Sequence, residues 1–154
     1  MTFAAETGPL AVVDFEHRGD GVTPVTAATP LPRDEYLACC GVQLDPIGAA
    51  TSIIWAGNAV GGFEARATCA AGPCTNSAGI RVTFVPPVAA AGADYPGGTN
   101  AAAFDSGGAL LSSQGATGSG TNFLGYAAAA PVGSVEYADS GGENLQRLVY
   151  RRCW

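Results

Sequence analysis

Apolar and polar residues alternate in short runs along most of the chain, and glycine, proline, asparagine and aspartate separate the runs. Alternation with a period of two puts the apolar side chains on one face of an extended strand. The clearest run is residues 80–85, in which Ile80, Val82 and Phe84 share a face. The same criteria predict strands at residues 11–16, 42–44, 52–55, 63–69, 80–85, 90–95, 101–104, 109–113, 121–126, 132–138 and 145–150.

Helical periodicity is nearly absent. The alanine runs at residues 89–91 and 127–130 are short and are flanked by proline or glycine, so they cannot form long helices. One helical turn is predicted at residues 32–37, where a proline precedes two acidic residues. Residues 105–108 predict a hairpin turn, and residues 112–121, rich in serine and glycine, predict an exposed loop.

The pattern as a whole predicts an all-β fold: an antiparallel β-sandwich or jelly roll of about 8–11 short strands. Neither an internal repeat nor a long linker divides the chain. We therefore expect a single domain over residues 1–154, with a core at about residues 11–150. The many alanines on strands favour closely packed sheets or a flat face that meets another subunit.

Composition narrows the classes of partner. The 154 residues carry 13 acidic side chains against 7 basic ones, for a net charge of −6, and no lysine occurs. This balance argues against nucleic acid and against an anionic membrane surface as partners. No apolar stretch is long enough for a transmembrane helix, and the first residues lack the basic start of a secretory signal peptide, so we expect neither.

The five cysteines leave several pairings open. Cys69 and Cys74 enclose a short stretch of turn residues, which predicts a disulfide between them. Adjacent cysteines rarely bond each other, so Cys39 or Cys40 is instead a candidate partner for Cys153. The alternatives are buried thiols, or a zinc site formed by Cys69, Cys74, one of the adjacent pair, and Cys153 or His17.

Signals for catalysis are missing. His17 is the only histidine and is expected to be exposed or at a sheet edge. The chain has neither a nucleophile elbow nor a phosphate-binding loop, so we expect no enzymatic activity.

Two other groups of residues are candidates for binding. Aromatic side chains can stack on sugar rings, which makes Trp55, Tyr95 and Tyr126 candidate ligand-binding residues. Arginine and tryptophan are enriched at interfaces, which makes Arg151, Arg152 and Trp154 candidate interface residues.

Several short motifs follow one another in an order that resembles that of the secreted bacterial β-sandwich domains of PEP-CTERM-type surface proteins. Those domains are themselves similar to carbohydrate-binding jelly rolls. The motifs are residues 13–16 (VDFE), Tyr36 followed by residues 41–44 (GVQL), residues 84–88 (FVPPV), residues 91–95 (AGADY), residues 105–111 (DSGGALL) and residues 123–125 (FLG). A Val-Glu-Tyr strand and a final strand follow, and the resemblance covers roughly residues 11–150.

This resemblance implies a place for calcium. In such domains acids on the last strand can lie near acids on the first strand and hold Ca²⁺, which makes Asp14 and Glu16 the candidate ligands. Here Gln146 and Arg147 occupy the positions of the last-strand acids, so we expect Arg147 to neutralise Asp14 or Glu16 instead. No other cofactor is expected.

Two functions of different classes fit these observations. The first is a non-enzymatic structural protein of a larger assembly, most plausibly a virion component such as a head decoration, tail or spike protein. It would be a homo-oligomer or be bound to a lattice of other subunits. The alternative is a secreted or cell-surface carbohydrate-binding module, located outside the cell, whose partner is a glycan.

Overall fold

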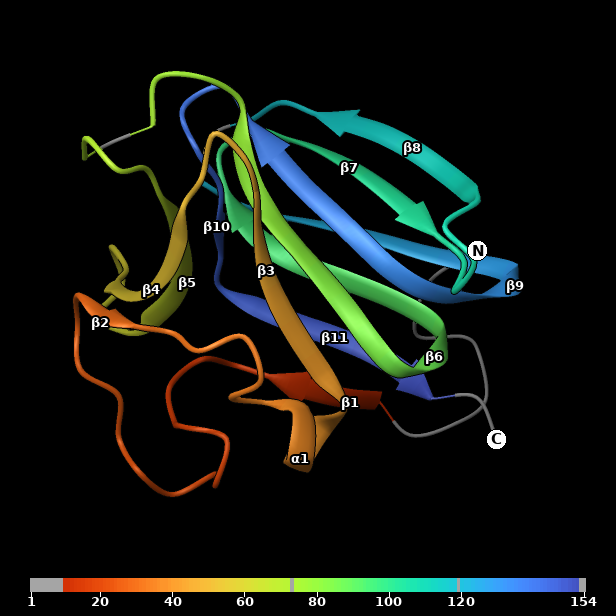
Figure 1. Cartoon of the computed structure of the whole chain (residues 1–154), viewed down its shortest axis with the longest axis horizontal. Helices are drawn as coiled ribbons and strands as arrows, with labels where there is room; N and C mark the ends of the chain where they lie inside the picture. The colour runs from red at the N-terminus through yellow and green to blue at the C-terminus, as the bar shows by residue number, and fades with distance from the viewer. Residues whose placement is uncertain (1–9, 73, 119, 153–154) are drawn as a thin grey trace.

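The computed structural model describes residues 10–72, 74–118 and 120–152, which form two antiparallel sheets and one short helix (Figure 1). The protein is all-β, and its sheets form a β-sandwich consistent with a jelly roll. The elements are β1 (Leu10–Val13), β2 (Thr29–Pro30), α1 (Leu37–Cys40), β3 (Val42–Gly48), β4 (Ser52–Gly57), β5 (Phe63–Thr68), β6 (Ala78–Pro96), β7 (Thr99–Phe104), β8 (Leu110–Ala116), β9 (Thr121–Asp139), β10 (Asn144–Leu145) and β11 (Arg147–Arg152).

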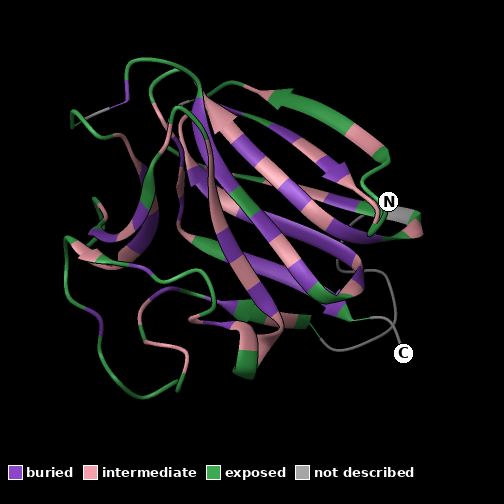
Figure 2. Cartoon of the chain, viewed as in Figure 1, coloured by how far each residue is buried: buried purple, intermediate pink, exposed green. Residues whose placement is uncertain are grey.

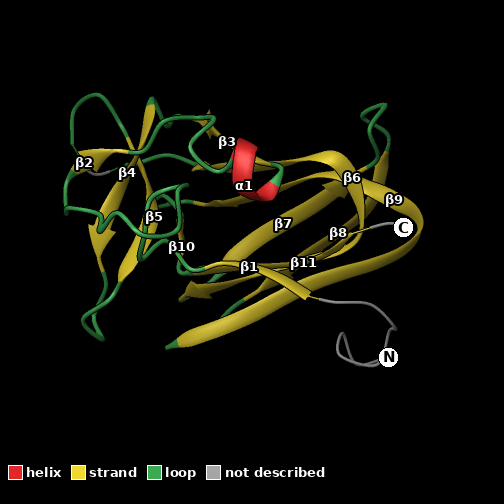
Figure 3. Ribbon diagram, turned by 90° about the horizontal axis from the view of Figure 1, so that it is seen from below, coloured by secondary structure: helices red, strands yellow, loops and turns green. Residues whose placement is uncertain are grey.

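The larger sheet has the strand order β1-β11-β6-β9-β7-β8, and β3 pairs with β6 as a seventh strand. The smaller sheet has the order β10-β5-β4-β2. It lies at the left end of the molecule in Figure 1, and Figure 3 shows it at the same end in a view turned by 90°.

Two long strands, β6 and β9, build both layers of the sandwich. The first half of β6, residues 78–84, pairs with β3 and with the second half of β9, which in turn pairs with β7. The second half of β6, residues 88–96, pairs with β11 and with the first half of β9. Both strands curve back at the end of the molecule opposite the smaller sheet (Figures 1 and 3). The two halves of each strand therefore lie in different layers.

The continuity of these strands differs from the sequence prediction, which gave separate strands at residues 80–85 and 90–95 and at residues 121–126 and 132–138. The reason lies at the bends. Pro86 and Pro87 offer no N–H to a neighbouring strand, and the register of β6 against β9 shifts between Thr83 and Val88. The alternation is interrupted there, while the chain stays extended.

The core forms where the alternating apolar faces of the two layers meet. Ile80, Val82 and Phe84 are buried in the core as predicted, and so are Val135 and Tyr137. Buried and more exposed positions alternate along the long strands (Figure 2). Leu148 and Tyr150 of β11 face the same core. The period-two pattern therefore identified the buried face of these strands correctly.

Two smaller predictions were only partly right. Residues 32–37 form hydrogen-bonded turns, with the Glu35 N–H donating to the Pro32 carbonyl and the Leu37 N–H to the Asp34 carbonyl, but the α-helical turn follows at Leu37–Cys40. The predicted loop at residues 112–121 is partly a strand, because residues 112–116 belong to β8 and pair with β7. Backbone pairing with β7 is sufficient there although serine and glycine are poor strand formers. Within the described residues, no helix has the length and apolar character needed to span a bilayer.

Candidate functional site

A cleft of about 300 Å³ lies between the segment that follows β1 and the helix α1. One side is formed by residues 12–14 and 17–21, and the other by Tyr36 and the two adjacent cysteines. Ligand sites are usually concave and combine apolar walls with a few polar groups. This cleft has that composition, with Val12, Asp14, His17, Asp20 and Cys39 among its lining residues.

The floor of the cleft is the buried side chain of Tyr36, of which 4% is exposed. Its hydroxyl donates a hydrogen bond to the backbone carbonyl of His17 over 2.7 Å. It also accepts one from Nε1 of Trp55 over 3.2 Å. Burial raises the pKa of Tyr36 to about 12, so its hydroxyl keeps its proton at neutral pH.

An ion pair fixes the loop after β1 against the segment before α1. The guanidinium of Arg18 donates to both carboxylate oxygens of Glu35, over 3.1 and 3.2 Å, and it lies over the ring of Trp55 at 5.2 Å. Hydrogen bonding and charge from Glu35 raise the pKa of Arg18 further. The backbone N–H of Gly19 donates to the same carboxylate over 2.9 Å. The positive charge of Arg18 is therefore neutralised within the protein.

Two carboxylates give the cleft a negative character. Asp20 accepts hydrogen bonds from the Thr23 hydroxyl and from the backbone N–H groups of Thr23 and Val22. These bonds, with the hydroxyl as the largest contribution, lower the pKa of Asp20 to about 2. Asp14 is exposed and accepts one bond, from the Glu16 N–H over 3.0 Å. The second oxygen of Asp14 makes no hydrogen bond to another described residue.

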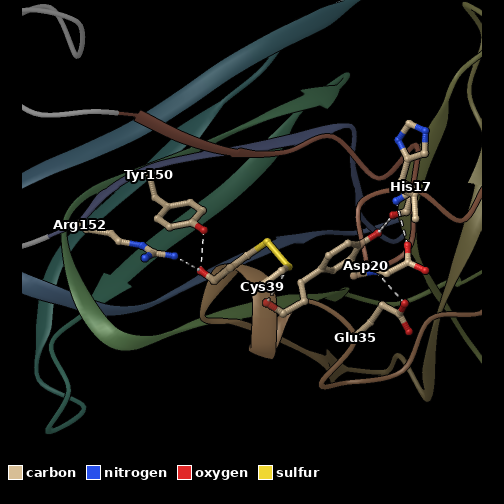
Figure 4. The surroundings of a disulfide bond; sticks show 10 residues. His17, Asp20, Glu35, Cys39, Tyr150 and Arg152 are labelled. Atoms are coloured by element: carbon tan, nitrogen blue, oxygen red, sulfur yellow. Dashed lines mark hydrogen bonds between the residues drawn. A yellow bond between two sulfur atoms is a disulfide. The ribbon is translucent and has the colours of Figure 1, made fainter.

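A disulfide joins Cys39 to Cys40 at the wall of the cleft, with the two Cα atoms 3.7 Å apart. This pairing contradicts the expectation that adjacent cysteines would seek other partners. Tyr150 donates to the carbonyl oxygen of Cys40 over 2.6 Å, and Arg152 approaches the same oxygen at 3.5 Å. Figure 4 shows both side chains reaching this oxygen from β11.

The second disulfide lies away from the cleft. Cys69 and Cys74 are joined in the structure, with a Cα–Cα distance of 5.2 Å, in the connection between β5 and β6. This is the pair that the sequence suggested. Since four cysteines are in disulfides, they cannot serve as zinc ligands in this state. Cys153 lies outside the described residues.

The aromatic residues selected from the sequence do not line the cleft. Trp55, Tyr95 and Tyr126 are 1%, 0% and 4% exposed, so their rings cannot stack on a ligand. The expectation of exposed rings was wrong because each lies on the inward face of its strand. A ring at such a position stabilises the fold more by packing in the core than it would at the surface.

The predicted interface residues are also separated by the structure. Arg151 is 4% exposed and belongs to the interior of the larger sheet, whereas Arg152 is exposed. Strict alternation along β11 would expose Arg151, because its neighbour Tyr150 is buried. Arg151 is nevertheless buried as well. Trp154 lies outside the described residues.

The calcium prediction finds little support in the side-chain contacts. Asp14 bonds locally, and Glu16 accepts the backbone N–H of Phe63 over 2.9 Å. Among the described residues, no three His, Cys, Asp or Glu side chains gather in a way that could hold a metal ion. Arg147 does not pair with either acid, because it binds Asp94 over 2.6 Å on the neighbouring strand.

Sequence reasoning missed the cleft because its residues are unremarkable one by one. His17 was correctly expected to be exposed. Gly19 is constrained by the contact between the two segments: a Cβ there would lie 1.7 Å from the carbonyl oxygen of Glu35, so this position requires glycine. A requirement of this kind is visible only once the two segments are placed together.

Comparison with known proteins gives fold similarity only. No protein-family model matches the chain, and no curated protein does. Among solved structures, an arabinose-bound α-L-arabinofuranosidase matches with 13% identity and a TM-score of 0.48, over 91% of this chain and 26% of that one. This chain therefore spans about a quarter of that enzyme.

Two further solved structures match with similarly low identity and TM-score. A family 6 carbohydrate-binding module has 14% identity and a TM-score of 0.40, over 71% of this chain and 94% of the module. The enzymatically active domain of tailspike protein 4 of bacteriophage CBA120 has 14% identity and a TM-score of 0.42, over 82% and 21%. These are distant matches between β-sandwich domains. None of the three bears on the resemblance to PEP-CTERM-type proteins, which stays a prediction.

Proposed function

We propose that this domain is a non-catalytic binding module and that its ligand is a carbohydrate bound in the cleft between β1 and α1. The observation that carries the proposal is the composition of the cleft. Its lining combines apolar groups, Val12 and the disulfide, with polar residues that can bond to hydroxyl groups, chiefly Asp14 and His17. Sugars present the same division, with C–H groups on their faces and hydroxyls at their edges.

A binding role fits the carboxylates better than catalysis does. A glycosidase of the usual kind needs a carboxylic acid with a raised pKa as proton donor. In this cleft the pKa of Asp20 is lowered, and its oxygens are occupied by the loop that contains it. Serine and threonine, which could supply a nucleophile, are absent from the described residues that line the cleft.

The experiment is a titration of the protein with methyl glycosides of neutral hexoses and pentoses and of N-acetylhexosamines, by isothermal calorimetry. The test variant is Asp14→Asn, and the matched control is Asp139→Asn, because Asp139 is likewise bonded to one backbone N–H, that of Ser140. We expect Asp14→Asn to weaken binding about tenfold or more, since hydrogen bonds to charged groups contribute about 1.5–3 kcal/mol. Failure of every glycoside to bind would rule out the proposal.

A subunit of a larger assembly, such as a virion, is the second candidate, and one observation favours it. Strand β1 is the edge of the larger sheet, and its Leu10 and Val12 are 45% and 51% exposed. Exposed apolar edge strands are sites at which further chains can pair. Both candidates place the protein outside the cell or on a particle, and the oligomeric state distinguishes them.

A further inference from the structure

We infer that the Cys39–Cys40 disulfide is the surface on which a single sugar ring rests, and that the cleft selects a neutral or amino sugar over an acidic one. This inference depends on the proposed function and adds the contacting group and the sugar class. Four observations support it, concerning rigidity, surface chemistry, size and charge.

The disulfide is rigidly held. Bonding between adjacent residues closes a small covalent ring that includes the peptide bond between them, so the sulfurs cannot move without the backbone. That backbone is anchored on both sides. Tyr150 holds the Cys40 carbonyl, and the N–H groups of Cys40 and Val42 both donate to the carbonyl of Tyr36. A surface that is fixed in advance loses little conformational entropy on binding.

The sulfur atoms supply the apolar surface that aromatic rings supply elsewhere. Disulfide sulfur is polarisable and has no N–H or O–H to donate, so it packs against C–H groups. Cys39 is exposed and Cys40 is half-buried. Among the described lining residues, Tyr36 is the one with a six-membered aromatic ring, and that ring is buried. On the side of the cleft formed by Tyr36 and the two cysteines, the disulfide is therefore the apolar group that is not fully buried.

The volume limits the ligand to one ring. Ligand pockets in proteins span roughly 300–1,000 Å³. At about 300 Å³, the cleft lies at the lower end of this range and suits a terminal sugar or a single branch. A polysaccharide lying across the cleft would leave most of its sugar rings outside the cleft.

The charges select against anions. Asp14 and Asp20 both lie in the lining, and Arg18, the one arginine among the described lining residues, is already paired with Glu35. A uronic acid would bring a third carboxylate into this space, against a protein with a net charge of −6. Neutral sugars avoid the repulsion, and the ammonium of a free amino sugar is attracted.

The experiment compares two double variants, Cys39→Ser/Cys40→Ser and Cys69→Ser/Cys74→Ser, by calorimetry with methyl glycosides of glucose, glucosamine and glucuronic acid. The second variant is the matched control because it removes the disulfide that lies outside the cleft. We expect the first to weaken glucoside binding about tenfold or more and the control to leave it unchanged. The glucuronide should bind at least tenfold more weakly than the glucoside to the unmodified protein. Retention of full affinity by Cys39→Ser/Cys40→Ser would overturn the inference.

A second measurement uses the unmodified protein and does not depend on how the variants fold. Titration of the ¹⁵N-labelled chain with methyl glucoside should shift the amide resonances of Cys39, Cys40 and Gly21 most. Binding with the main shifts elsewhere, or equal affinity for the glucuronide, would overturn the inference and leave a carbohydrate-binding function intact. Absence of binding by any glycoside would remove the proposed function and the inference together.

Discussion

At the scale of single residues, Gly19 controls the shape of the cleft. Its backbone N–H bonds to the Glu35 carboxylate, and its α-carbon lies directly against the Glu35 carbonyl. A methyl group cannot be added there without moving the loop that carries His17 and Asp20 away from α1.

We therefore expect Gly19→Ala to lower the free energy of unfolding by about 1–3 kcal/mol, the usual range for overpacking. Gly141→Ala is the control, because a Cβ at Gly141 would meet no atom within 4 Å. It should change stability by less than about 0.5 kcal/mol. Urea denaturation measures both. Equal stabilities of the two variants would contradict the placement of Gly19.

Glu143 makes the stability of the fold depend on pH. Its side chain is 2% exposed, and it accepts hydrogen bonds from the Thr99 hydroxyl and the Asn144 N–H. Burial outweighs these bonds and raises the pKa of Glu143 from 4.5 to about 7. The folded state therefore holds this proton more tightly than the unfolded state does.

Because the folded-state pKa is the higher one, the contribution of Glu143 to stability is fully present below pH 4.5 and is lost as the pH rises to about 7. The loss should be about 3 kcal/mol, from 1.36 kcal/mol per pKa unit. Glu143→Gln should remove this dependence, and Glu136→Gln, at the exposed ion pair with Arg81, should retain it. Denaturation of the three proteins across this pH range provides the test, and an unchanged slope in Glu143→Gln would refute the assignment.

At the scale of elements, the two disulfides should act on different properties. The Cys69–Cys74 bond closes a loop between β5 and β6, with a sequence separation of 5, so it restricts the unfolded chain. Loop closure of this length contributes about 2 kcal/mol. Cys39 and Cys40 are neighbours, so their bond encloses no further residues and restricts the unfolded chain far less.

Thermal unfolding of the two double serine variants should show this contrast. Cys69→Ser/Cys74→Ser should lower the free energy of unfolding by about 2 kcal/mol, and Cys39→Ser/Cys40→Ser by clearly less. The order of stabilities is thus opposite to the order of effects on sugar binding. The same order in both measurements would mean that the loss of binding reflects general destabilisation.

The strands also show which parts of the fold can be predicted from the sequence and which cannot. The strands β3, β4 and β5 were predicted because period-two alternation is a local signal. The continuity of β6 past Pro86 was missed, since proline suggests an end wherever the next register is unknown. The burial of Trp55 was missed because it depends on which segments, distant in sequence, lie against each other. The disulfide at α1 joins adjacent residues and was missed because such cysteines rarely bond each other.

At the scale of the whole molecule, the exposed edge strand provides the test of assembly. If copies or partners pair with β1, then Val12→Lys should dissociate the resulting oligomer, because a charged side chain on an edge strand disfavours the addition of another strand. Val60→Lys is the control, since Val60 is 87% exposed in the β4–β5 turn and belongs to no strand.

Light scattering during size exclusion, over a range of concentrations, gives the oligomeric state of the three proteins. An oligomer lost only in Val12→Lys would support a subunit of an assembly. A monomer at all concentrations would exclude self-assembly through β1 and favour the isolated binding module.

The pairing of the first and last described strands has a consequence for how such a domain can be combined with others. Leu10 of β1 is the register partner of Arg151 of β11. A chain that enters at β1 therefore leaves within one strand spacing of the same point, about 5 Å away. A domain with this geometry can be inserted into a surface loop of a host protein without forcing the ends of that loop apart, and it tolerates circular permutation for the same reason.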